Sequence, residues 1–172
     1  AFQLTADDAR ASDNEALRWS AAQGHLDTLR YLVETFQLTV RDARARNNEA
    51  LRMSAVNGHL DTLRYLVETF HLTAEDARAV NNEALRLCAS RGHLDTLRYL
   101  VETFQLTAED ARADDNQALR CSASEGHLDT LRYLVETFRL TAEDARVDDN
   151  QALCRCASGG HLDTLRYLKE AF

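Results

Sequence analysis

The chain has 172 residues, of which 45% are hydrophobic and 28% charged, and it carries a formal net charge of −8 at pH 7. This acidic balance, with no basic patch in any part of the chain, disfavours nucleic acid as a partner, because a phosphate backbone would be repelled. There is neither a run of about 18 apolar residues nor a signal-peptide pattern, so we expect no membrane contact and a cytoplasmic chain.

Nearly the same 34-residue segment occurs five times, in residues 2–35, 36–69, 70–103, 104–137 and 138–171. A fixed period of this length is typical of a solenoid, in which each unit buries its apolar face only against its neighbours. We therefore interpret residues 1–172 as a single repeat array. Residues shared by all units are expected to build the array, and residues that differ between units give it individuality.

The first element predicted in each unit is a short helix. In the fourth unit, Thr107-Ala-Glu-Asp110 is a capping-box sequence, in which a hydroxyl and a carboxylate three residues later satisfy each other's backbone groups. It predicts a helix of about two turns through Arg112. We expect helical turns here and not the strands of a hairpin, because the segment has no glycine and no β-branched alternation.

Two longer helices are predicted to follow. The segment 114–116 interrupts the helical pattern, and Asn116 is predicted to cap a second helix over residues 117–124. Gly126 supplies a left-handed residue that ends this helix, and a third helix is predicted from residue 128 to about 137. Nothing alternates with a period of two, so the predicted fold class is an all-α helical repeat solenoid.

The second and third helices resemble the helix–turn–helix of an ankyrin repeat. The stretch Ala118–Leu134 contains a leucine, two small residues three and four positions later, two variable positions, and then Gly-His-Leu with a Leu/Val-rich helix. This set recurs in all five units. The chain departs from the family in its period, which is usually about 33, and in the Glu/Gln-Ala-Leu-Arg that replaces Thr-Pro-Leu-His. The resemblance implies an ankyrin-like variant with a short helix in place of the β-hairpin, and a role in protein–protein recognition.

A histidine follows the conserved glycine in every unit, at His25, His59, His93, His127 and His161. Stacked helices lie roughly 8–10 Å apart, whereas zinc ligands converge on one ion at about 2.0–2.1 Å. We therefore predict structural histidines that bond a neighbouring turn, with no metal and no cofactor. Tyrosine and phenylalanine ladders, including Phe2, are interpreted as packing. No nucleophile triad or phosphate cradle is present, so we predict no enzyme and no catalytic residues; a metal protein or enzyme built on the histidines is the distant alternative.

The four cysteines, Cys88, Cys121, Cys154 and Cys156, are predicted to be reduced thiols. Stacked helices hold equivalent positions farther apart than the roughly 4.4–6.8 Å between Cα atoms that a disulfide tolerates. Cys154 and Cys156 are two residues apart on a predicted helix and point to different sides. Free thiols are typical of a reducing, cytosol-like compartment.

The units differ at a few positions only: the pair before the invariant asparagine, the residue two places after the shared leucine, and the pair before the glycine. The resemblance implies that the residues before the glycine and those in the loop before the first main helix line a concave face that contacts partners, and the variable positions largely coincide with them. A position that accepts Trp, Cys and Arg is not close-packed, so we expect at least partial exposure. The predicted partner-binding residues are Trp19, Ala22, Gln23, Arg46, Met53, Val56, Asn57, Val80, Leu87, Ser90, Arg91, Asp114, Asp115, Cys121, Glu125, Asp148, Asp149 and Arg155.

Within this set, Trp19, Met53 and Leu87 are predicted to form an apolar stripe, and the acidic residues of the last two units are predicted to steer a basic segment. The predicted function is a protein–protein interaction scaffold that binds a protein or peptide through its variable concave face. The alternative is a designed, consensus-like or recently duplicated structural rod without a cognate partner. The near-identity of the units favours this alternative, whereas the free thiols argue against deliberate design. Neutral drift of an unused surface also explains the variation. End-to-end self-association is expected from apolar terminal faces.

Overall fold

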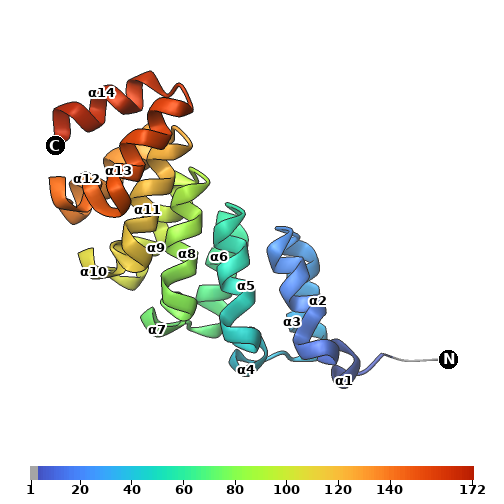
Figure 1. The fold of residues 1–172 in the computed structure, drawn as a ribbon. Helices are drawn as coiled ribbons and strands as arrows, with labels where there is room; N and C mark the ends of the chain where they lie inside the picture. The colour runs from blue at the N-terminus through green and yellow to red at the C-terminus, as the bar shows by residue number, and fades with distance from the viewer. Residues whose placement is uncertain (1–3) are drawn as a thin grey trace.

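The computed structural model describes residues 4–172, in which fourteen helices and no strand are found (Figure 1). The predicted all-α solenoid is confirmed. The short helices are α1 (Ala6–Ala9), α4 (Val40–Ala43), α7 (Ala74–Ala77) and α10 (Ala108–Ala111). The first main helices are α2 (Ala11–Ala22), α5 (Ala45–Val56), α8 (Ala79–Ser90), α11 (Ala113–Ser124) and α13 (Ala142–Ser158), the last of which includes the short helix of its unit. The second main helices are α3 (Leu26–Phe36), α6 (Leu60–Phe70), α9 (Leu94–Phe104), α12 (Leu128–Phe138) and α14 (Leu162–Ala171).

The short helices begin at capping boxes, as predicted. In the fourth unit the carboxylate of Asp110 accepts hydrogen bonds from the Thr107 backbone N–H, at 2.8 Å, and from the Thr107 hydroxyl, at 3.1 Å. These bonds satisfy groups at the helix start that have no partner inside the helix. The expectation of a helical turn here, and not a hairpin strand, is therefore confirmed.

A left-handed turn lies within the N-terminal part of each first main helix and corrects the prediction for Asn116. Residues 114, 115 and 116 have φ angles of 57°, 53° and 57°, and the same three positions are left-handed in every unit. Asn116 does not cap the helix, because its side-chain Oδ1 is buried without a hydrogen-bond partner. A left-handed conformation costs an L-residue roughly 1–2 kcal/mol, so three in a row require an opposing interaction elsewhere.

The core is a continuous row of leucines between the stacked units. Leu17, Leu51, Leu85 and Leu119 of the first main helices are fully buried, as are Leu29, Leu63, Leu97 and Leu131 of the second. Neighbouring first main helices lie closer together than neighbouring second main helices. The array therefore curves toward the first main helices, which face the viewer in Figure 1. Residues 1–3, and with them Phe2, lie outside the described residues.

The glycine and histidine of the conserved turn meet across each junction between units. Gly92 has a φ of 73°, and a Cβ placed on it would lie 2.6 Å from Cγ of His127 in the next unit. The ring thus packs on a glycine that is needed both for its left-handed backbone and for its lack of a side chain. Within residues 4–172 no imidazole hydrogen bond to a neighbouring turn is found, so the predicted bonding is wrong and packing replaces it.

The described part of the chain has neither a metal-binding cluster nor a membrane-spanning helix. Among residues 4–172, no group of three or more His, Cys, Asp or Glu side chains is placed to hold a metal ion. No helix in that range combines the length and the apolar character needed to cross a membrane.

Candidate partner-binding surface

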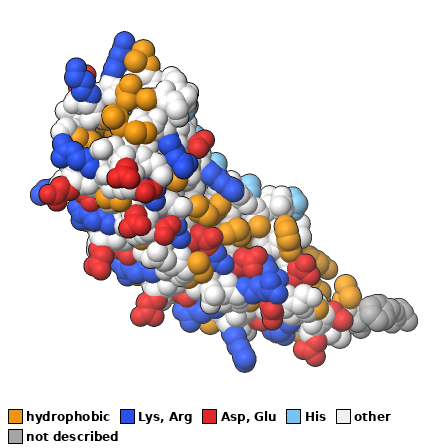
Figure 2. Space-filling model, viewed as in Figure 1, with side chains coloured by type: hydrophobic (Ala, Val, Ile, Leu, Met, Phe, Trp, Pro, Cys, Tyr) orange, Lys and Arg blue, Asp and Glu red, His pale blue; other side chains and the backbone are white. Residues whose placement is uncertain are grey.

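The residue two places after the shared leucine forms a row along the first main helices. Trp19 on α2, Met53 on α5, Leu87 on α8, Cys121 on α11 and Arg155 on α13 occupy equivalent positions. Trp19 is 56% exposed, Arg155 is exposed, and the three residues between them are half-buried. Because the array curves toward these helices, the row lies along its inner side. Figure 2 shows apolar side chains on the same face, bordered by acidic and basic ones.

The pair before each glycine contributes less free surface than predicted. Val56 is only 2% exposed, so the expected exposure is wrong at this position. Arg91 of the next unit reaches back over it, with Nη1 3.4 Å from the Val56 carbonyl oxygen. Asn57 also contacts the neighbouring unit, since its Nδ2 donates a hydrogen bond to the Ala22 carbonyl oxygen at 2.8 Å. The other pair members are at least partly exposed: Ala22, Gln23, Ser90, Arg91 and Glu125.

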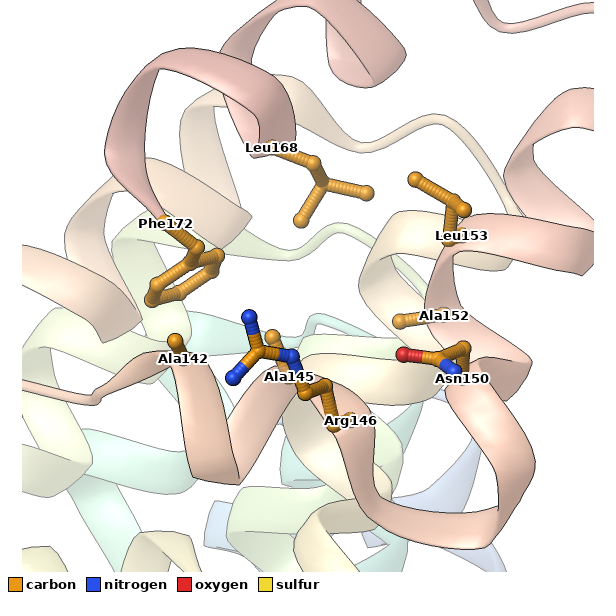
Figure 3. Close-up of a pocket in the computed structure, with 8 residues that line it drawn as sticks. All are labelled: Ala142, Ala145, Arg146, Asn150, Ala152, Leu153, Leu168 and Phe172. Atoms are coloured by element: carbon orange, nitrogen blue, oxygen red, sulfur yellow. The ribbon is translucent and has the colours of Figure 1, made fainter.

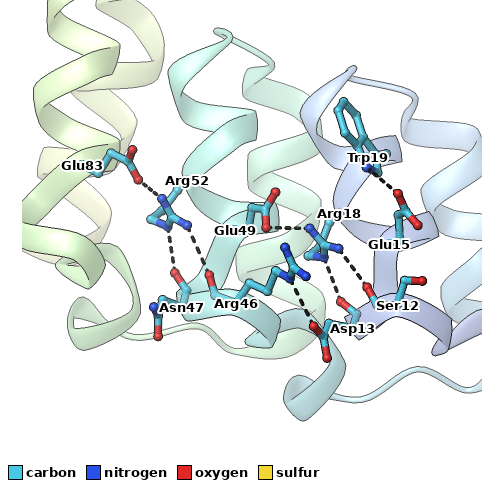
Figure 4. A network of polar contacts seen from close by, with 10 residues as sticks. All are labelled: Ser12, Asp13, Glu15, Arg18, Trp19, Arg46, Asn47, Glu49, Arg52 and Glu83. Carbon is cyan, nitrogen blue, oxygen red and sulfur yellow. Dashed lines mark hydrogen bonds and ion pairs between the residues drawn. The ribbon is translucent and has the colours of Figure 1, made fainter.

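In the first three units a buried arginine holds the left-handed turn against the next unit, and Figure 4 shows the first two of these arginines. Arg18, which is 5% exposed, donates from Nε to the Asp13 carbonyl at 2.8 Å and from Nη2 to the Ser12 carbonyl at 2.9 Å. Its Nη1 reaches Glu49 of the second unit at 2.6 Å. One guanidinium therefore satisfies two turn carbonyls and one carboxylate across the junction, which suits its planar fork of donors.

The same arginine recurs three more times and is replaced in the last unit. Arg52 pairs with Glu83, while Arg86 and Arg120 reach Asp114 and Asp148, each at 2.8 Å. The fifth unit has Cys154 at this position. Sequence reasoning missed these arginines. The available signal was an arginine conserved four residues after the invariant asparagine in four units.

These pairs reduce the free charge that was predicted to steer a basic partner. Asp114 and Asp148 are held by arginines of the preceding units, and the predicted contact residue Arg46 pairs with Asp13 at 3.2 Å. Asp115, Asp149 and Glu125 are exposed, and no ion pair involves them within the described chain. Val80, also predicted, is 47% exposed at the start of α8.

A second ladder of ion pairs joins the short helices. Arg10 binds Asp42, Arg44 binds Asp76, Arg78 binds Asp110 and Arg112 binds Asp144, with shortest N–O distances of 2.9, 2.8, 2.7 and 2.6 Å. Each of these aspartates is also the capping-box residue of its own unit. The hydrogen bond from Arg112, with help from Thr141 and against the effect of burial, lowers the pKa of Asp144 to about 2.

The four thiols are free, as predicted. Cys88 is buried, and its Sγ lies 3.4 Å from the His93 carbonyl oxygen. Burial raises the pKa of Cys88 to about 12, which makes it an inert packing residue. Cys121, by contrast, is half-buried in the row, and Cys154 is exposed.

One family model, described as "Ankyrin repeats (3 copies)", matches residues 2–76, 68–144 and 85–171. Together these segments include every helix that carries the surface. A search of curated proteins returned no match.

Proposed function

The chain belongs to the ankyrin repeat family, whose members are generally protein–protein interaction modules, and on that premise we propose that it binds a protein or peptide along its first main helices. The proposed contacts are the predicted residues without Val56, which is buried. Asn57 and Arg91 contribute at the edge of this surface, because part of their hydrogen bonding serves the junctions.

The observation that supports this proposal most is the apolar row of Trp19, Met53 and Leu87 on three adjacent helices. Trp19 exposes 56% of its surface, and its ring is held by a hydrogen bond of 3.2 Å from Nε1 to the Glu15 carboxylate. A large, oriented and exposed aromatic side chain is typical of the residues that dominate binding energy. The row is also the place where otherwise repeated units differ most in side-chain chemistry.

The charge distribution suggests the chemistry of the partner. The apolar residues Trp19, Met53 and Leu87 lie in the first three units, and the exposed carboxylates of Asp115, Glu125 and Asp149 lie in the last two units. We propose a partner segment with apolar side chains at one end and basic side chains at the other. The basic end would mainly raise the rate of association and fix the orientation.

The test compares two triple variants of the intact chain as bait. The first variant, Trp19→Ala/Met53→Ala/Leu87→Ala, lacks the three apolar side chains of the row. The second variant, Thr35→Ala/Thr69→Ala/Thr103→Ala, lacks three exposed side chains on the second main helices of the same units. A partner captured by the unaltered chain should bind the first variant at least about tenfold more weakly. It should bind the second variant with unchanged affinity. Equal retention by both variants would contradict the proposal.

The alternative of a structural rod without a cognate partner is favoured by the junctions. The same arginine–aspartate pair and the same histidine–glycine contact recur at all four of them. If the chain is only a structural rod, the variant Trp19→Ala/Met53→Ala/Leu87→Ala will lose no specific partner. Under either proposal we expect a cytoplasmic chain with no enzymatic activity and no nucleic-acid partner.

A further inference from the structure

Each junction between units is asymmetric: the two units that meet there contribute different side chains, which fit one another. The unit nearer the N-terminus supplies an arginine to an aspartate, a second arginine to a tyrosine ring, and a glycine to a histidine. At the third junction these contacts are Arg78 with Asp110, at 2.7 Å, and Arg98 with its guanidinium carbon 5.3 Å from the centroid of the Tyr133 ring. Equivalent contacts occur at the other three junctions.

The C-terminal face carries the first set of groups without complements. Arg146 makes no ion pair within the described residues, and a Cβ on Gly160 would meet nothing within 4 Å. Leu153 is 47% exposed, whereas the four equivalent leucines are fully buried. Arg146, Leu153, Leu168 and Phe172 line an open hollow of about 210 Å³ on this face (Figure 3).

The N-terminal face carries the complementary set. Asp8 is exposed and has no arginine partner within the described residues, and Tyr31 is 63% exposed. Leu4 is 61% exposed, whereas its equivalents in the other units are 6–7% exposed. Ala16 is exposed, whereas its equivalents, Ala50, Ala84, Ala118 and Ala152, are 0–1% exposed.

We infer that the N-terminal face of one chain docks on the C-terminal face of a second copy, as one unit docks on the next inside the chain. Asp8 of one copy would pair with Arg146 of the other, and Tyr31 would lie under Arg166. His25 would pack on Gly160. Such a heterologous contact has no two-fold symmetry, so it gives open oligomers that grow with concentration. This inference rests on the junction contacts and is independent of the proposed partner surface.

Two residues of the last unit differ from their equivalents in the other units and make this contact weaker than an internal junction. Lys169 stands where the other units have valines that are 7–9% exposed, so docking would bring its charge to a largely buried place. Cys154 replaces the arginine that would hold the next unit. Association between separate chains also loses translational and rotational freedom. We therefore expect a reversible contact that Lys169→Val strengthens.

The test uses one blocked face at a time. Ala16→Arg blocks the N-terminal face and Leu153→Arg blocks the C-terminal face. Both positions are exposed in the free chain, so neither change should disturb the fold. Thr35→Arg adds the same charge at a position exposed in every unit that carries this threonine, and serves as the control.

Sedimentation velocity from about 1 µM to about 1 mM should show concentration-dependent oligomers for the unaltered chain and for Thr35→Arg. Each blocked variant alone should stay monomeric, because it lacks one of the two faces. An equimolar mixture of the two should form a dimer and nothing larger, since each supplies the face that the other lacks. A monomeric unaltered chain over the whole range overturns the inference. So does a mixture that stays monomeric, or a blocked variant that dimerises alone, which would indicate a symmetric contact.

Discussion

The contact of each histidine with the preceding glycine makes a quantitative prediction for Gly92→Ala. The new Cβ would meet two obstacles. The φ of 73° is unfavourable for any residue with a side chain, and the Cβ would lie 2.6 Å from Cγ of His127. Because Cγ is joined to the histidine backbone through a single rotatable bond, the ring can move away only by changing its χ1 rotamer or by opening the junction.

The structure contains a matched site at which the first obstacle acts alone. Gly160 has a φ of 74°, but a Cβ there would meet no atom within 4 Å. Gly160→Ala should therefore cost only the backbone term, roughly 1–2 kcal/mol. Gly92→Ala should cost this amount plus roughly 1–3 kcal/mol for overpacking of the junction.

The assay is a double-mutant cycle in urea, followed by circular dichroism, with Gly92→Ala measured in the unaltered chain and in His127→Ala. In the second background the ring is gone, so Gly92→Ala should cost about as much as Gly160→Ala. The coupling energy should be roughly 1–3 kcal/mol. This design avoids comparing an internal unit with a terminal one, which can unfold locally. If Gly92→Ala cost the same in both backgrounds, the ring would not be packed on the glycine and the reasoning would be refuted.

Three further predictions follow from other contacts. Arg52→Ala should destabilise the chain by roughly 3–5 kcal/mol in urea unfolding, because it leaves Glu83 and a left-handed turn without their donor, and Arg52→Lys should recover little of this; a loss below about 1 kcal/mol would contradict the role. The hydrogen bond from Arg112 lowers the pKa of Asp144 to about 2 from an ordinary 3.8, so its stabilisation is complete above about pH 4 and is lost as pH falls toward 2; Arg112→Gln should reduce this acid dependence, measured as melting temperature against pH. Zinc should not raise the melting temperature, since a specific ligand at a hundredfold excess over Kd would add about 2.7 kcal/mol; calorimetry showing tight, integer zinc binding that His93→Ala abolishes would restore the metal hypothesis.

The helices were predictable because their signals are local. The capping box at Thr107, the left-handed Gly126 and the helical spacing of the leucines all act within a few residues. The left-handed turns were not predicted, because the arginine that donates to their carbonyls is held in place by a partner that is distant in sequence: Arg18 bonds its own turn and pairs with Glu49 of the next unit. The accumulation of Asn and Asp at these positions was a local sign, but it indicates a helix cap equally well.

The candidate surface was predictable at the level of positions but not of contacts. Trp19 is exposed as expected, because a position that accepts such different side chains is not in the core. Val56 was misjudged: it is only 2% exposed, and Arg91 of the following unit reaches its backbone, with Nη1 3.4 Å from the Val56 carbonyl oxygen. The free charge of Asp114 and Asp148 was overestimated for the same kind of reason, since each is paired with an arginine of the preceding unit. The sequence of a single unit does not indicate which of its residues the neighbouring units contact.

The recurrence of the same pairs at every junction means that whole units are interchangeable. Arg44 binds Asp76 at 2.8 Å, and Asp110 occupies the equivalent place one unit later. Removing residues 70–103 would therefore bring Asp110 to the place of Asp76, where it can pair with Arg44. The shortened chain would lose Leu87 from the row, Glu83 from its pair with Arg52, and the contact of Arg91 with Val56, and it would keep the arginine–aspartate and histidine–glycine contacts. Gain or loss of 34 residues would thus change the length of the array and the order of its exposed side chains, while the arginine–aspartate and histidine–glycine contacts between neighbouring units would stay the same.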